Sequence, residues 1–143
     1  MTALSVERIA FERGRMVMLV RVSPSSARRL GPDRAARLLR ARPLLARHAC
    51  LNAEGAPFGA ILARTSLPHV LEHLVIDFQA EADEHLRSAA LGAADRSAAT
   101  FVGTTEWLNE REGLARVAVN FTDDLIALAA LKSALALMEG MVD

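Results

Sequence analysis

Two pairs of apolar segments, one near each end of the chain, constrain its fold more than any other sequence feature. Residues 4–11 and 16–22 flank a short polar stretch that contains a glycine, and residues 99–108 and 114–121 flank another. Apolar and polar residues alternate in the last of these segments, which is typical of a strand with one buried face. Because short connections with glycine favour hairpins, we expect two hairpins that form a mainly antiparallel sheet.

Three segments outside these hairpins predict helices. Pro32 is suited to the first turn of an amphipathic helix with leucines at helical spacing. Ser66 is a favoured N-cap for a long helix that we expect to run to about Ala90, before a polar break at residues 92–97. Residues 123–139 predict a last helix that is apolar on nearly every side, so we expect it to pack against the sheet or against a second subunit in a homodimer.

A short apolar segment, residues 58–63, predicts a further strand between the first two helices. The element order is then ββαβαββα, and the fold class is α+β, a two-layer sandwich in which helices pack on a mainly antiparallel sheet. A length of 143 residues suits one compact domain, so we expect residues 1–143 to fold as a single domain.

The composition narrows the classes of function. Basic and acidic residues balance, with 17 of each, which argues against a general nucleic-acid binder. The chain has no apolar run of about 18 residues that would span a membrane, and its N-terminus lacks the pattern of a signal peptide. Cys50 is the only cysteine and cannot form an internal disulfide, so we expect a reducing, cytoplasmic setting.

The charges are nevertheless unevenly spread along the chain. Between Arg21 and Arg47 there are eight arginines and only one acidic residue, Asp33. A charge run of this kind is most often a solvated face. The alternative is a docking surface for an anionic ligand or partner.

His69, Glu72 and His73 form an H-x-x-E-H motif within the long predicted helix. Residues three and four positions apart share one face of a helix, so both imidazoles can point at one ion with the carboxylate beside them. Zinc favours nitrogen ligands and lowers the pKa of a bound water, and a neighbouring carboxylate can act as general base. The motif is the inverted form of the H-E-x-x-H metallopeptidase motif. The alternative is a pair of polar helix residues with a structural role only.

A catalytic zinc site needs a third protein ligand. Glu106 lies at the end of a predicted strand, and His48 and Cys50 form a His-Ala-Cys pair in the loop before residues 58–63. The alternative for Cys50 is a small core residue. The single tryptophan, Trp107, is either a core residue or a platform for substrate.

Most of the chain resembles the N-terminal domain of cyanophycin synthetases. The resemblance is carried by residues 42–79, RPLLARHACLNAEGAPFGAILARTSLPHVLEHLVIDFQ, and by residues 101–138, FVGTTEWLNEREGLARVAVNFTDDLIALAALKSALALM. The shared pattern is an H-x-C pair, a glycine turn, a strand, a helix with H-x-x-E-H, a G-x-T-x-E strand end and an alanine-rich helix. In that family the domain precedes an ATP-grasp domain and a Mur-ligase-like domain, for which this chain has no room, so we expect a stand-alone homologue.

The resemblance implies roles for particular residues. His69 and His73 would bind the metal, Glu72 would be the general base, and Glu106 would be the best third ligand. The same inverted motif lies on a helix over an antiparallel sheet in S-ribosylhomocysteinase and in insulysin-type peptidases, which implies an S-ribosylhomocysteinase/insulysin-like fold. S-ribosylhomocysteinase takes its third ligand from a cysteine that this chain lacks at the matching place.

Together these features favour a zinc-dependent, metallopeptidase-like hydrolase that cuts an amide or isopeptide bond, with a cyanophycin-like peptide as the candidate substrate. The first alternative is a non-catalytic module that keeps the fold and binds a polymer or a protein. The second alternative is a purely structural metal site, or none.

Overall fold

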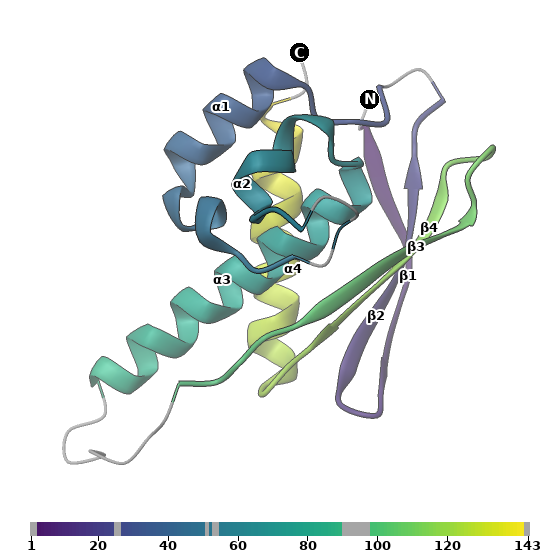
Figure 1. The fold of residues 1–143 in the computed structure, drawn as a ribbon. Helices are drawn as coiled ribbons and strands as arrows, with labels where there is room; N and C mark the ends of the chain where they lie inside the picture. The colour runs from purple at the N-terminus through teal and green to yellow at the C-terminus, as the bar shows by residue number, and fades with distance from the viewer. Residues whose placement is uncertain (1–2, 25–26, 51, 53–54, 90–97, 142–143) are drawn as a thin grey trace.

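The computed structural model describes residues 3–24, 27–50, 52, 55–89 and 98–141 (Figure 1). The polar break expected at residues 92–97 lies outside the described residues. The elements, in chain order, are β1 (Leu4–Glu12), β2 (Arg15–Val22), α1 (Pro32–Ala41), the 3₁₀ helix η1 (Pro43–Arg47), α2 (Phe58–Ile61), the 3₁₀ helix η2 (Leu62–Arg64), α3 (Leu67–Ala89), β3 (Gly103–Asn109), β4 (Leu114–Asn120) and α4 (Asp124–Glu139).

The two predicted hairpins form one four-stranded antiparallel sheet with the strand order β1-β2-β4-β3. The central strands β2 and β4 pair with each other, so the first and last hairpins of the chain lie side by side. The first hairpin turns at Arg13 and Gly14, whose φ angles of 51° and 77° are both positive, as a tight two-residue hairpin turn requires. The prediction of a mainly antiparallel sheet is confirmed.

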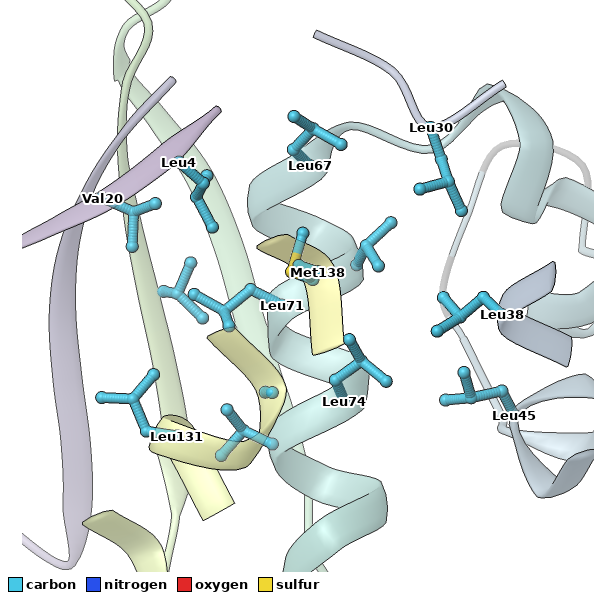
Figure 2. Close-up of a cluster of buried hydrophobic side chains, with 14 of the residues drawn as sticks. Leu4, Val20, Leu30, Leu38, Leu45, Leu67, Leu71, Leu74, Leu131 and Met138 are labelled. Atoms are coloured by element: carbon cyan, nitrogen blue, oxygen red, sulfur yellow. The ribbon is translucent and has the colours of Figure 1, made fainter. Parts of the chain in front are cut away.

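The helices cover one face of this sheet (Figure 1). The long helix α3 contacts β2, β3 and β4, and α4 packs along α3. Met16, Met18 and Val20 alternate along β2 and are completely buried beneath the helices. Figure 2 shows the apolar core running from Val20 on the sheet through Leu71 on α3 to Leu38 on α1. The α+β class, with helices packed on an antiparallel sheet, is therefore confirmed.

The strand predicted at residues 58–63 is wrong. This segment forms α2 and η2, and its completely buried side chains Phe58 and Leu62 are four positions apart, which is about one helical turn. Gly59 lets α2 lie close to η1, because a Cβ atom there would stand 2.8 Å from Cα of Ala46. A short apolar run fits a buried strand and a buried helical turn equally well, and the packing against η1 selects the helix. The predicted order ββαβαββα is corrected accordingly.

Side chains cap the N-termini of the two longest helices, and Ser66 is the cap that the sequence predicts for the first of them. Ser66 Oγ accepts a hydrogen bond from the backbone N–H of His69 at 3.4 Å, and α3 then runs to Ala89. At the start of α4, Asp123 accepts hydrogen bonds from two backbone N–H groups, at 2.9 and 3.0 Å. Among the described residues, no helix is both long enough and apolar enough to cross a membrane.

Candidate metal centre

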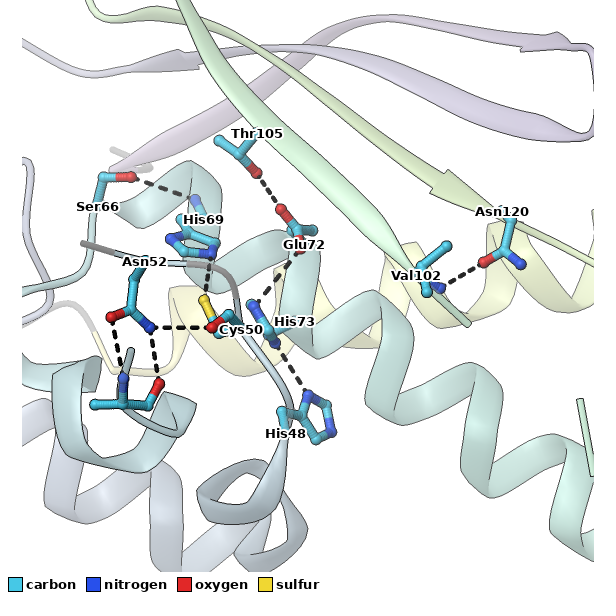
Figure 3. A network of polar contacts seen from close by, with 11 residues as sticks. His48, Cys50, Asn52, Ser66, His69, Glu72, His73, Val102, Thr105 and Asn120 are labelled. Atoms are coloured by element: carbon cyan, nitrogen blue, oxygen red, sulfur yellow. Dashed lines mark hydrogen bonds and ion pairs between the residues drawn. The ribbon is translucent and has the colours of Figure 1, made fainter. Parts of the chain in front are cut away.

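The H-x-x-E-H motif lies in the first turns of α3, where the helix faces the loop that follows η1. This loop carries Cys50, and the sulfur of Cys50 lies 3.5 Å from Nε2 of His69 (Figure 3). One ligand atom each of Cys50, His69 and His73 lies within 4.8 Å of the other two. Among the described residues, these three side chains are the only group of histidines, cysteines and carboxylates close enough together to share one metal ion.

The structure does not bring Glu106 to this cluster. Successive side chains of a strand point to opposite faces of the sheet. Thr105 faces α3, where its hydroxyl contacts Glu72, so Glu106 faces away from the helices, and it lies opposite Arg116 on β4. Cys50 stands beside the two histidines instead. The His-Ala-Cys pair was the sequence signal for this ligand, but no local spacing shows that the loop folds over α3.

Burial keeps the imidazole of His73 neutral. The side chain is 2% exposed and stacks on Phe58, with ring centroids 3.7 Å apart and planes at 13°. Burial, followed by the proximity of His69 and His48, lowers the pKa of His73 to about 3, and burial lowers the pKa of His69 as well. Neutral imidazole is the form that binds a metal.

A hydrogen-bonded chain behind His73 orients its ring. Nδ1 of His73 lies 3.1 Å from Nδ1 of His48, and Nε2 of His48 lies 3.3 Å from a carboxylate oxygen of Asp77. When His48 is neutral, its Nε2–H donates to Asp77, so its Nδ1 can only accept a hydrogen bond from His73. The proton of His73 is then on Nδ1, and Nε2 turns its lone pair toward Glu72. Metal-binding histidines are commonly oriented by partners of this kind.

Asp77 and Arg42 hold this chain in place from the other end. Arg42 Nε donates to Asp77 at 2.6 Å, and the Arg42 guanidinium also lies 4.0 Å from the ring centre of Phe78. Burial by itself raises the pKa of Asp77, but hydrogen bonds from His48 and Arg42 outweigh it, and the pKa is lowered overall. Asp77 is therefore an ionised acceptor at neutral pH.

Glu72 is fixed beside the cluster by β3. Its Oε1 accepts a hydrogen bond from the Thr105 hydroxyl at 2.7 Å, and its Oε2 lies 3.6 Å from Nε2 of His73. Burial raises the pKa of Glu72, and the hydrogen bond from Thr105 opposes this shift. Gly103 makes room for the carboxylate, because a Cβ atom at that position would stand 2.7 Å from Cγ of Glu72.

The donor set fits a divalent cation. With Nδ1 of His73 protonated, a lone pair on Nε2 faces a carboxylate oxygen of Glu72, and neither atom supplies a proton to the other. A cation, or a proton on Glu72, removes this conflict. Two neutral imidazoles and a cysteine sulfur are ligands that zinc accepts in tetrahedral sites. Burial raises the pKa of the Cys50 thiol, so binding there would release a proton.

A pocket of about 650 Å³ opens beside these residues. Its walls come from the loop after η1, from α3 and from residues 100–105 at the start of β3, and they include all three candidate ligands and Glu72. This size suits a peptide-sized segment or another small molecule. Trp107 is not part of these walls; it is half-buried and packs against the apolar core, and its role as a platform for substrate stays a prediction.

No model of a known protein family matches this chain, and no curated protein is significantly similar to it in sequence.

We predict that Gly103→Ala displaces Glu72 and destabilises the fold. The new methyl group would press on Cγ of Glu72 and stand 2.9 Å from the carbonyl oxygen of Ala118. Overpacking of this kind costs about 1–3 kcal/mol, measurable by urea unfolding. The matched control is Gly140→Ala, where the nearest atoms are 3.6 Å away and no loss is expected. Equal effects of the two substitutions would contradict the tight contact with Glu72.

We also predict that acid destabilises the metal-free protein through His73. A histidine with a lowered pKa in the folded state binds its proton more readily when unfolded, so stability falls as pH drops from about 6.5 toward 3. Between pH 7 and pH 5 this one group would cost about 2 kcal/mol. The measurement is urea unfolding with a chelator present. In His73→Gln, the free energy of unfolding should fall by about 2 kcal/mol less between pH 7 and pH 5 than it does in the wild type. An equal fall in the two proteins would refute the lowered pKa of His73.

Proposed function

We propose that this protein is a small metal-dependent hydrolase that cleaves an amide or isopeptide bond. The observation that carries the proposal is the position of Glu72, whose Oε2 faces the cluster of Cys50, His69 and His73 from the wall of an open pocket. Thr105 occupies only the other carboxylate oxygen, so Oε2 stays available for proton transfer. Two imidazoles and one thiolate favour zinc as the cation.

The side chains around the pocket have complementary roles in this reaction. When bound, the cation would polarise the substrate's carbonyl group and acidify water in the pocket. Glu72 Oε2 would take one proton from the attacking water while the water oxygen bonds to the carbonyl carbon. Glu72 would give this proton to the leaving nitrogen as the C–N bond breaks. The products are a carboxylic acid and an amine, and Glu72 returns to its ionised form.

The resemblance to the N-terminal domain of cyanophycin synthetases supports the same proposal. An H-x-x-E-H helix over an antiparallel sheet is also the arrangement of S-ribosylhomocysteinase and of insulysin-type peptidases, and we include this fold relationship in the proposal. Cys50 would complete the ligand set in place of Glu106. A cyanophycin-like peptide is accordingly one proposed substrate.

The first test is the metal content of protein purified without chelators or nickel resin. We expect about one zinc ion per chain in the wild type, and a large loss in His73→Ala and in Cys50→Ser. The matched control is His85→Ala, because His85 is an exposed histidine on the same helix. Absence of metal from the wild type, even after zinc is offered, would refute the proposal.

The second test separates catalysis from metal binding. Glu72→Gln should keep its zinc and lose about 10²–10⁴-fold in the rate of hydrolysis of amide or isopeptide substrates, because it removes a general base. Glu84→Gln, an exposed glutamate on the same helix, should keep the wild-type rate. If the zinc-loaded wild type hydrolyses none of a broad set of peptides, the hydrolase proposal is excluded and the alternative of a binding module remains.

A further inference from the structure

A second, more polar hollow adjoins the metal centre. It measures about 340 Å³, and His69 lines both this hollow and the pocket beside Glu72. The other lining residues that matter here are Arg28, Arg29, Arg64 and Trp107. We call this hollow the arginine pocket. The arginine pocket and the pocket beside Glu72 therefore adjoin, with His69 in the wall of each.

The arginine pocket carries an excess of positive charge. Among the described residues that line it, Arg28 and Arg29 contribute two guanidinium groups besides that of Arg64, and Glu110 is the one acidic residue. Within the described part of the chain, neither Arg28 nor Arg29 forms an ion pair with a carboxylate. Both donate to backbone carbonyl oxygens instead, Arg29 to that of Arg64 at 3.2 Å. A carbonyl oxygen satisfies one N–H group but does not neutralise the charge, and each guanidinium has five N–H donors.

Arg28 is held in position before any ligand arrives. Its guanidinium donates to the backbone carbonyl oxygens of Glu110 and Arg111 in the turn between β3 and β4. The same group lies 5.6 Å from the ring centre of Trp107. Trp107, the only tryptophan of the chain, does not line the pocket of the metal centre, but here its ring helps to hold the Arg28 guanidinium. A fixed arginine loses little conformational entropy when it binds an anion, which favours binding.

The backbone fixes the arginines relative to the metal centre. The N–H of Leu67, the first residue of α3, donates to the carbonyl oxygen of Arg28 at 2.8 Å, and Arg29 forms a β-bridge with Ser66. His69 follows only two residues later on the same helix. The distance between the arginine pocket and the metal centre is therefore set by one rigid segment, as a site that recognises two parts of one molecule requires.

We propose that the arginine pocket is a subsite for an anionic group of the substrate, a carboxylate or a phosphate. This inference rests on the proposed function only in identifying the bound anion as part of a substrate, because anion binding itself can be measured with or without a metal. Guanidinium groups bind both kinds of anion through paired charge-assisted hydrogen bonds. The substrate would then be an acidic molecule whose negative group binds beside His69, next to the metal centre.

The test is an NMR titration of the 143-residue chain, with and without zinc, that follows arginine Nε–H signals. The probes are inorganic phosphate and N-acetylaspartate amide, and N-acetylasparagine amide is the neutral control. We expect the two anions, or one of them, to shift the signals of Arg28 and Arg29, and the neutral amide to leave them unchanged. Which anion binds more tightly distinguishes a carboxylate subsite from a phosphate subsite.

Variants locate the binding. Arg29→Gln should weaken anion binding about tenfold, the effect of losing one charge-assisted hydrogen bond. Arg40→Gln, an exposed arginine of α1 outside the pocket, should leave binding unchanged. Because Arg28 also anchors the turn between β3 and β4, Arg28→Lys serves as the variant that keeps the charge, with circular dichroism to verify folding.

Two results would overturn the subsite and leave the hydrolase proposal intact. The first is a wild type that binds zinc but neither anion. The second is an equal loss of anion binding in Arg29→Gln and Arg40→Gln. Anion binding without zinc binding would overturn the hydrolase proposal alone.

Discussion

The burial of α3 is the constraint on which the rest of the structure depends. The helix is covered by the sheet, by α4 and by the segment from η1 to η2, and ten of its residues are buried, four of them polar. A buried polar group without a partner costs about 1–3 kcal/mol, so each of these four side chains requires a specific neighbour. Thr105 supplies one for Glu72, His48 for His73, and Arg42 for Asp77. The side-chain amide of Gln79 donates to the carbonyl oxygen of Asn120 at 3.1 Å, while its Oε1 has no hydrogen-bond partner among the described residues. The candidate site is built from these obligatory pairs.

The same burial explains why the site has two distinct walls. The loop after η1 brings His48 and Cys50 over one side of α3, while the start of β3 brings Gly103 and Thr105 to the other. The proposed ligands face the loop, and the proposed base is held by the strand. Helix α3 thus supplies both histidines and Glu72, while the loop adds Cys50 and the strand adds the hydrogen bond from Thr105 that holds the carboxylate.

Much of the fold could be predicted because its signals are local. Alternating apolar residues and glycine turns predicted both hairpins, and the cap at Ser66 predicted the start of the long helix. The segment at residues 58–63 could not be assigned in this way, since an apolar run of that length is compatible with either structure. Its helical state depends on the close approach of Gly59 to Ala46, which are far enough apart in sequence that no local pattern reports it.

For the candidate site, the sequence by itself determined that His69, Glu72 and His73 share one helix face, because helical spacing alone places them together. Only the tertiary structure decided which residue stands beside them. Strand alternation turns Glu106 away from the helices, and the loop after η1 carries Cys50 to the histidines. The partners of Asp77 and the arginine pocket were likewise settled by packing. The physical reason is that contacts within one helix are fixed by backbone geometry, whereas contacts between segments depend on how their buried surfaces fit together.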